Sequence, residues 1–256
     1  MLLKAVADNK YGSSSKAIFE AAPPEILKDG SFILSILEQD GNLLKCASVE
    51  SKNDTSLVLA AVTANGRALK YASVQLQNDS HIVRAAVTGE ALQFASERCK
   101  NDKNIVLAAV SQNGRALYYA STNLRIDKDN VLAAVSQDGE AEALNFASTN
   151  LKNDKDIVLA AMSQNGAALR HASTDLRNDE TVVEAAVSAT SCGSLRYASQ
   201  RLREDKAFIS NVVRKEGGAL RDASRALRSD KDCVLAAVSS RPEALKYAFG
   251  KAKPRS

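Results

Sequence analysis

Residues 153–177 read NDKDIVLAAMSQNGAALRHASTDLR, and nearly the same text returns at residues 101–125 and 53–77. Self-similarity at a fixed period is the signature of repeat proteins, in which one small structural unit stacks on its own copies. The pattern starts nine times along the chain, at Lys28, Asn53, Asn78, Asn101, Ile126, Asn153, Asn178, Glu204 and Ser229. This repeat therefore governs the interpretation of every other residue.

The first half of each unit predicts a buried helix. Its second position is always Asp: Asp29, Asp54, Asp79, Asp102, Asp127, Asp154, Asp179, Asp205 and Asp230. An Asp directly before an apolar run is a typical N-cap, because its carboxylate accepts the free N–H groups of the first turn. A β-strand would also fit so short a run, but the Asp before it, the Ala pair inside it and the Gly after it favour a helix. Left-handed caps are expected at Gly66, Gly114, Gly139 and Gly166.

The second half of each unit predicts another helix, with a recurrent Leu and an Ala three residues later. Leu117, Ala120, Ser121 and Leu124 would share one face of it. Helices of about ten residues are marginal alone in water, so each pair must cover its neighbour. The sequence therefore predicts an all-α fold, an αα-hairpin solenoid of nine two-helix repeats of roughly 25 residues each.

The domain boundaries follow from the places where the pattern fades. Residues 1–27 hold remnants of both helices, which predicts a degenerate capping unit. Residues 28–250 are expected to form a single repeat domain, because no Gly/Ser-rich linker interrupts them. Residues 251–256 are expected to be a frayed basic tail.

The stretch at residues 153–173 resembles the repeat family catalogued as domain of unknown function 4116. The resemblance extends over about residues 28–250, and several fixed positions carry it together. The units depart from the family pattern at His171 and Asp222, which replace the usual Tyr or Phe, and at Pro242. Members occur in intracellular bacteria, protists and large viruses, some within secreted effectors, which implies action on host-cell proteins. The resemblance supplies no activity and no catalytic residues.

No candidate active site emerges from the residues. His81 and His171 lie in different units, and His171 stands in a column that is otherwise mostly aromatic. Three cysteines stand at apolar positions of the repeat, as buried thiols do: Cys46, Cys99 and Cys233. Cys192 lies in a lengthened turn with no base nearby in the sequence. No phosphate-loop, zinc or dinucleotide spacing is present. We therefore expect no enzyme activity, no cofactor and no metal, with the Asp column explained by capping.

Positive charge gathers in the last quarter of the chain. Residues 195–256 carry 15 Lys or Arg against 7 Asp or Glu, whereas the whole chain has a net charge of only +4. On the predicted second helices these cations would share one exposed face, here called the basic ridge: Arg170, Arg177, Arg196, Arg203, Arg221, Arg225, Arg228 and Lys246. Arg177, Arg203 and Arg228 also suit the C-terminal end of a helix dipole. The basic ridge is the candidate partner-binding surface.

The expected function is a non-enzymatic protein–protein interaction scaffold, monomeric and without a transmembrane segment. The runner-up is a nucleic-acid binder that combines the basic ridge with base stacking on Tyr197 and Tyr247. A structural spacer within a larger protein is the third interpretation. Unpaired cysteines and the absence of a signal-peptide pattern predict a reducing interior. That interior is the cytoplasm of the producing cell or of a host cell that receives the protein.

Overall fold

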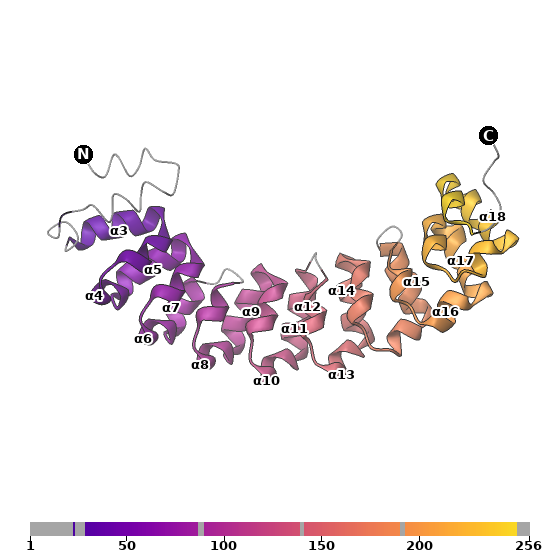
Figure 1. Cartoon of the computed structure of the whole chain (residues 1–256). Helices are drawn as coiled ribbons and strands as arrows, with labels where there is room; N and C mark the ends of the chain where they lie inside the picture. Colours follow the sequence, from indigo (N-terminus) through magenta and orange to yellow (C-terminus); the bar gives the residue numbers. More distant parts are fainter. Residues whose placement is uncertain (1–22, 24–28, 87–89, 139–140, 190–192, 250–256) are drawn as a thin grey trace. The chain divides into compact units, whose positions relative to one another are not determined.

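The structure is a computed structural model of the 256-residue chain, and it describes residues 23, 29–86, 90–138, 141–189 and 193–249 (Figure 1). Within these ranges every regular element is a helix, which confirms the predicted all-α class. The chain forms two compact units, Met1–Arg125 and Ile126–Ser256. The predicted capping unit (apart from Pro23) and the predicted basic tail lie outside the described residues.

The first unit repeats three helical segments. The long α-helices are α3 (Gly30–Gln39), α5 (Thr55–Ala64), α7 (Ser80–Ala85) and α9 (Lys103–Gln112). Each is followed by a 3₁₀-helix, namely η2 (Gly41–Cys46), η3 (Gly66–Tyr71), η4 (Ala91–Phe94) and η5 (Gly114–Tyr119). A short α-helix completes each repeat: α4 (Val49–Lys52), α6 (Val74–Gln77), α8 (Glu97–Lys100) and α10 (Thr122–Arg125). These short helices follow one another along one edge of the unit (Figure 1).

The second unit has the same plan. Its long helices are α11 (Lys128–Ser136), α14 (Lys155–Gln164), α15 (Glu180–Ala189), α17 (Lys206–Lys215) and α18 (Lys231–Ser240). The middle segments are α12 (Ala143–Phe146), η6 (Gly166–His171), η8 (Leu195–Tyr197), η9 (Gly217–Asp222) and η11 (Pro242–Tyr247). The short segments are α13 (Thr149–Lys152), η7 (Leu176–Asn178), α16 (Gln200–Glu204) and η10 (Leu227–Ser229).

The predicted Asp caps are confirmed at all nine positions. At the start of α5, Oδ1 of Asp54 accepts from the backbone N–H groups of Ser56 and Leu57, both at 2.9 Å. These bonds satisfy donors that a helix leaves unpaired at its N-terminus. The Asp column is therefore a structural feature of the repeat.

The core lies between successive long helices and the middle segments. In the first unit α3 packs on α5, α5 on α7 and α7 on α9, and the second unit continues in the same manner from α11 to α18. The recurrent Leu of the middle segment is at most 1% exposed in eight repeats, whereas Leu245 in the last is 51% exposed. Three polar side chains are buried in the second unit: Asn130, Asp138 and Ser194. Asn130 is fully buried, and its side-chain amide has no hydrogen-bond partner among the described residues.

The glycines after the long helices do not form the predicted left-handed caps. Helices α5, α9 and α14 end at an Asn with extended backbone, with φ near −152° at Asn65. Oδ1 of Asn65 accepts from the N–H of Arg67 at 3.0 Å, so the Asn caps the next segment. Gly66, Gly114 and Gly166 are the first residues of 3₁₀-helices, and that prediction is wrong for them. Gly139 lies outside the described residues.

Close packing of the next repeat accounts for glycine at two of these positions. A Cβ added to Gly41 would lie 2.0 Å from the carbonyl oxygen of Ala61 in α5. A Cβ added to Gly217 would lie 2.3 Å from the carbonyl oxygen of Ala237 in α18. Both distances are far below van der Waals contact, and the neighbouring atom is rigid helix backbone. Glycine therefore lets the start of a middle segment touch the following long helix.

The predicted second helix is interrupted, which corrects the two-helix description of the repeat. Ala72, directly after η3, has extended backbone with φ −65° and ψ 159°, and the other repeats break at the equivalent Ala. Oγ of the following Ser73 accepts from the N–H of Leu76 at 3.3 Å and starts the separate helix α6. Ser competes well for such N-cap positions. The first eight repeats therefore have three helical segments each, and the last has a long and a middle segment within the described residues.

A pair of hydrogen bonds at this break ties the start of a short segment to the end of the preceding short segment. The backbone N–H of Ser121 donates to the carbonyl oxygen of Lys100 at 2.9 Å, and its hydroxyl donates to Oδ1 of Asn101 at 2.6 Å. This Ser–Asn bridge recurs at Ser73 with Asn53, Ser96 with Asn78, Ser173 with Asn153 and Ser199 with Asn178. Five of the nine repeats begin with Asn-Asp, and in these the Asn accepts the Ser hydroxyl while the Asp caps the long helix.

In the second unit the capping carboxylates also bind a Lys of the preceding repeat. Nζ of Lys128 lies 2.7 Å from Asp154, Nζ of Lys155 lies 3.1 Å from Asp179, and Nζ of Lys206 lies 2.7 Å from Asp230. Hydrogen bonding from Lys206 lowers the pKa of Asp230 to about 2. The pKa of Asp179 is also about 2, chiefly because the Thr181 hydroxyl donates to it. These ion pairs are exposed, so each one contributes little alone.

Gly41→Ala should lower the free energy of unfolding by about 1–3 kcal/mol, because its Cβ would collide with the backbone of α5. The matched control is Gly30→Ala in the first turn of α3, where an added Cβ meets nothing within 4 Å. There Ala should leave stability unchanged or raise it by up to about 1 kcal/mol. Urea unfolding followed by circular dichroism measures both variants. Equal effects of the two substitutions would contradict the packing explanation.

Candidate partner-binding surfaces

The basic ridge is divided between two helical segments of each repeat. Its leading members lie in the middle segments: Arg170, Arg196, Arg221 and Lys246. The others lie beyond the break, in the short segments or the turns that precede them: Arg177, Arg203, Arg225 and Arg228. The extended Ala between the segments separates the two sets. The ridge is therefore not the single helix face predicted from the sequence.

The arginines that end the short segments are largely used by the fold. Arg177, Arg203 and Arg228 are half-buried. Nε of Arg177 and of Arg203 is enclosed by protein, and Nε of Arg228 donates to the carbonyl oxygen of Tyr247 at 2.8 Å. Long cationic side chains often pack their stems in this way. These three residues contribute packing as well as charge.

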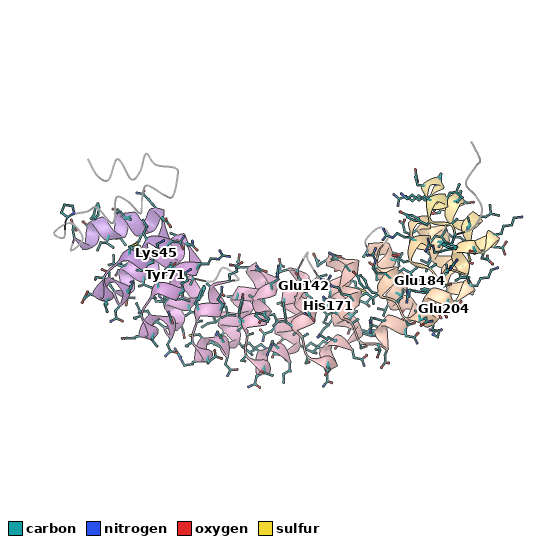
Figure 2. All side chains as sticks on the ribbon, in the orientation of Figure 1. Lys45, Tyr71, Glu142, His171, Glu184 and Glu204 are labelled. Atoms are coloured by element: carbon teal, nitrogen blue, oxygen red, sulfur yellow. The ribbon has the colours of Figure 1, made fainter. Side chains whose placement is uncertain are left out.

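Arg170 forms a small polar cluster with Glu142 and His171. Figure 2 labels Glu142 and His171, which lie near each other. Its Nη2 pairs with Oε1 of Glu142, and its Nε donates to Nε2 of His171 at 2.7 Å. Accepting this bond requires a neutral imidazole. Burial lowers the pKa of His171 below its usual 6.5, and the charges of Arg170 and Lys152 add to this, whereas Glu142 and Asp138 oppose it. His171 is therefore a half-buried packing group in the aromatic column.

Arg196 and Arg221 converge on one carboxylate, that of Asp222. Nε of Arg196 lies 3.7 Å from Oδ2, and Nε of Arg221 lies 3.3 Å from Oδ1. Asp222 stands in the aromatic column, and its side chain is only 10% exposed. The Nη2 atoms of the two arginines also meet beside Gly193. They lie 3.6 Å and 3.3 Å from the position that a Cβ on Gly193 would occupy.

Two further cations of the ridge lie over aromatic rings. The guanidinium of Arg225 lies 4.0 Å from the ring centroid of Phe249. Nζ of Lys246 lies 5.0 Å from the centroid of Tyr247, and the guanidinium of Arg221 lies 5.9 Å from the same centroid. Cation–π attraction favours such positions. Arg225 and Lys246 nevertheless remain exposed to solvent.

A second set of exposed positions, not predicted from the sequence, lies on the long helices. The fifth residue after each capping Asp is Leu in six repeats, here called the leucine row: Leu34, Leu59 and Leu107 in the first unit, and Leu132, Leu159 and Leu235 in the second. Leu132 and Leu235 are 40% and 54% exposed, and the others are partly exposed. The same position holds Arg84, Glu184 and Ser210 in the remaining repeats. That polar substitution is the sequence signal that could have revealed the surface.

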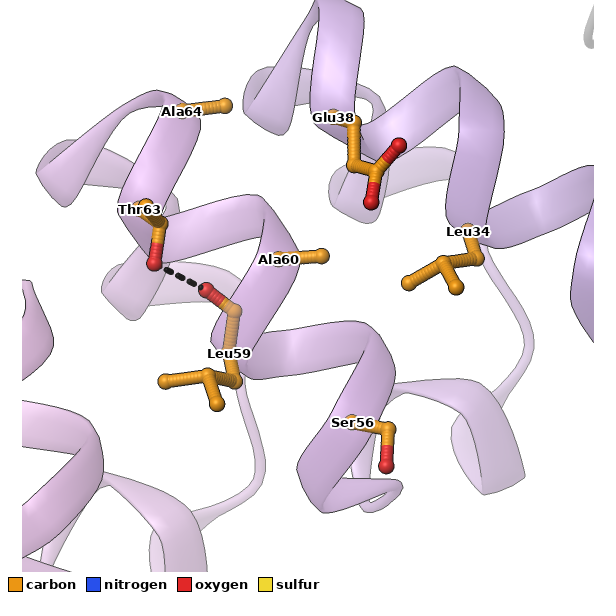
Figure 3. Close-up of a pocket in the computed structure, with 7 residues that line it drawn as sticks. All are labelled: Leu34, Glu38, Ser56, Leu59, Ala60, Thr63 and Ala64. Atoms are coloured by element: carbon orange, nitrogen blue, oxygen red, sulfur yellow. Dashed lines mark hydrogen bonds between the residues drawn. The ribbon is translucent and has the colours of Figure 1, made fainter.

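Leu34 and Leu59 of the leucine row line an open groove between α3 and α5, with a volume of about 450 Å³ (Figure 3). Leu34 of α3 and Ala60 of α5 point toward one another across it. Glu38, Ser56 and Thr63 supply its polar margin. Such a concave, largely apolar surface with a polar margin suits an apolar side chain of a binding partner.

Features of an enzyme or a membrane protein are not seen in the described ranges. No three His, Cys, Asp or Glu side chains gather there as a metal site, and no helix there could cross a membrane. Cys99 and Cys233 are buried and Cys46 is half-buried, all as free thiols. Burial raises the pKa of the Cys233 thiol, so its reactive thiolate form is disfavoured. Cys192 lies outside the described residues.

Repeated units of capped helices define the chain as a helical-repeat protein. One family, described as Domain of unknown function (DUF4116), matches residues 29–77, 79–125, 127–177, 154–203 and 205–250. The chain therefore belongs to this family. No curated protein and no solved structure matches it.

Acidification should destabilise the second unit through His171. Its pKa is lower in the folded chain than in the unfolded one, so the unfolded chain binds more protons in the window below pH 6.5. The free energy of unfolding should therefore keep its full value above pH 6.5 and decrease as the pH falls below 6.5. His171→Phe, with the residue found at Phe146, should remove this loss. The control His81→Gln should retain it. Urea unfolding across the pH range measures all three proteins, and an unchanged profile for His171→Phe would refute the assignment.

Proposed function

We propose that the chain is an α-solenoid that serves as a non-enzymatic scaffold for binding another protein. In this proposal the nine repeats of residues 28–250 stack as one array with residues 1–27 as its capping unit, each repeat having one long helix and one interrupted second helix. Support comes from the stacking of successive long helices within each unit, from the Ser–Asn bridges and from family matches that run from residue 29 to residue 250.

The observation that carries the proposal is the leucine row. Its position accepts Arg84, Glu184 and Ser210, so the fold does not require an apolar side chain there. Leucines left partly in water at six such positions lose the free energy that burial would supply, about 1.5–3 kcal/mol for a fully buried side chain. A partner protein that covers them recovers part of it. Clustered apolar groups of this kind mark protein-interaction sites.

The polar groups beside the leucine row favour such covering. The hydroxyl of Thr63 donates to the carbonyl oxygen of Leu59 at 2.8 Å, within its own helix. Hydroxyls at the equivalent position of other repeats do the same: Ser111 to Leu107, Ser136 to Leu132 and Ser188 to Glu184. Donors that are already satisfied need no replacement partner when water is removed. Desolvation of this face therefore costs little.

The partner is expected among the proteins of a host cell, with the chain acting there as a secreted effector. That expectation rests on the family resemblance alone. The two other interpretations make different demands on the surface. A nucleic-acid binder would use the basic ridge, and a structural spacer would use neither surface.

Replacing leucines of the row should abolish partner binding without unfolding the chain. The test variant is Leu59→Arg with Leu107→Arg, because Arg already stands at the equivalent position 84. The control is Val74→Arg, which places the same charge on an apolar residue that is 81% exposed on a short helix. Proximity labelling in the native or host cell should mark a defined set of proteins with wild type and control, and lose it with the double variant.

Equal thermal unfolding of the three proteins by circular dichroism establishes that the substitutions leave the fold intact. The proposal fails if all three proteins label the same set, since the leucine row would then be irrelevant. It also fails if wild type labels nothing above the unfused labelling enzyme.

A further inference from the structure

We propose that the C-terminal basic cluster, defined as Arg196, Arg221, Arg225 and Lys246, docks an acidic peptide segment of the partner protein. This inference rests on the proposed function and adds the chemistry of the partner. The cluster lies on the middle segments of the last repeats and on the turn before η10, whereas the leucine row lies on the long helices.

The convergence of Arg196 and Arg221 is the first observation behind the site. Their Nη2 atoms meet beside Gly193, where the missing side chain leaves room for both. Neighbouring guanidinium groups repel each other unless an anion compensates their charge. Asp222 supplies one carboxylate, at 3.7 Å and 3.3 Å from their Nε atoms. The arrangement therefore already accommodates a carboxylate, which serves as an internal example of the proposed ligand group.

Asp222 lies beneath the more exposed cations that it faces. Asp222 faces Arg196 and Arg221, while the two other cations of the cluster contact aromatic rings. The side chain of Asp222 is 10% exposed, whereas those of Arg196 and Arg221 are 48% and 36% exposed. Positive charge therefore faces solvent while the compensating negative charge lies beneath it. An incoming carboxylate finds exposed guanidinium groups that can bind it through two parallel hydrogen bonds.

The aromatic rings hold the remaining cations in place. Phe249 lies under Arg225 at 4.0 Å, and Tyr247 contacts Lys246 at 5.0 Å. Long flexible side chains normally lose rotamer entropy when they bind a ligand, and prior restriction reduces that loss. The rings thus organise the cluster before the partner arrives.

The same contacts favour a peptide over a nucleic acid. Binding of single strands relies on bases stacking on open aromatic faces. The ring of Tyr247 is engaged by Lys246 and Arg221, and that of Phe249 by Arg225, so both rings serve to position cations of the chain. Carboxylates of Glu or Asp require only the guanidinium and ammonium groups. We therefore commit to an acidic peptide, with RNA as an outcome of the test.

The test is fluorescence anisotropy of a labelled peptide of alternating Glu and Gly, titrated with the full chain at low salt. A peptide of alternating Gln and Gly and a single-stranded RNA oligonucleotide serve as comparison probes. The Glu peptide should bind, weaken as salt screens the charges, and bind more tightly than the Gln peptide and the RNA. The proposal is overturned if the Glu peptide does not bind, or if the RNA binds and the peptide does not.

Two variants test the location of the site. Arg225→Gln with Lys246→Gln changes exposed residues only. Arg196→Gln with Arg221→Gln is combined with Asp222→Tyr, which restores the aromatic column and leaves no buried carboxylate unpaired. Each should weaken binding of the Glu peptide by about tenfold or more. The control Arg214→Gln with Lys231→Gln removes the same charge as the first variant, from exposed positions elsewhere in the unit, and should bind like wild type. Equal weakening by the control would overturn the site.

The result is separable from that of the proposed function. The variant Leu59→Arg with Leu107→Arg should bind the Glu peptide like wild type while it loses labelled partners in the cell. Loss of peptide binding in that variant would contradict a separate basic site. Absence of peptide binding by wild type, together with partner labelling that depends on the leucine row, would overturn the acidic site alone.

Discussion

In five of the nine repeats, two hydrogen bonds tie the break between the middle and short segments to the end of the preceding short segment. The Ser amide reaches the last carbonyl of the preceding short helix, and the Ser hydroxyl reaches the Asn that follows that carbonyl. Helices of four to ten residues are marginal in isolation, so the stability of each one depends on its neighbours. Where it occurs, the Ser–Asn bridge fixes the register between the break and the preceding short segment.

The other recurrent residues support the packing of neighbouring repeats through separate contacts. The capping Asp begins a long helix at the level where a Lys of the preceding repeat in the second unit can reach it. Gly41 and Gly217 allow a middle segment to touch the next long helix without a Cβ between them. Asp, Asn, Gly, Leu and Ser of the repeat are thus assigned to folding. Residues that differ between repeats are left for binding, above all the leucine row and the C-terminal basic cluster.

Local features of this fold could be predicted from the sequence, and long-range features could not. The Asp caps and the buried Leu column follow from short patterns, and both are confirmed. The break after Ala120 was missed because Leu117 and Leu124 fit the period of one continuous helix equally well. The left-handed caps predicted at Gly66 and Gly166 are wrong. Asn-Gly usually predicts a left-handed turn, whereas here the Asn is extended and caps the next segment.

The same limit applies to the surfaces. Pairing of Arg170 with Glu142 joins residues 28 positions apart, which no local pattern reveals. Partial exposure of the leucine row depends on the groove between neighbouring long helices. The Arg, Glu and Ser found in that column were visible in the sequence, and a comparison of each column across the repeats would have found them.

A double-mutant cycle on one Ser–Asn bridge tests the central claim most directly. The free energy of unfolding is measured for wild type, Ser121→Ala, Asn101→Ala and the double variant. The account predicts that each substitution destabilises and that the two are coupled by about 0.5–1.5 kcal/mol, as expected for a hydrogen bond between them. Ser111→Ala, whose hydroxyl bonds within α9, should show no coupling to Asn101→Ala. Additive effects of Ser121→Ala and Asn101→Ala would contradict the claim that this bridge ties the break to the end of the preceding short segment.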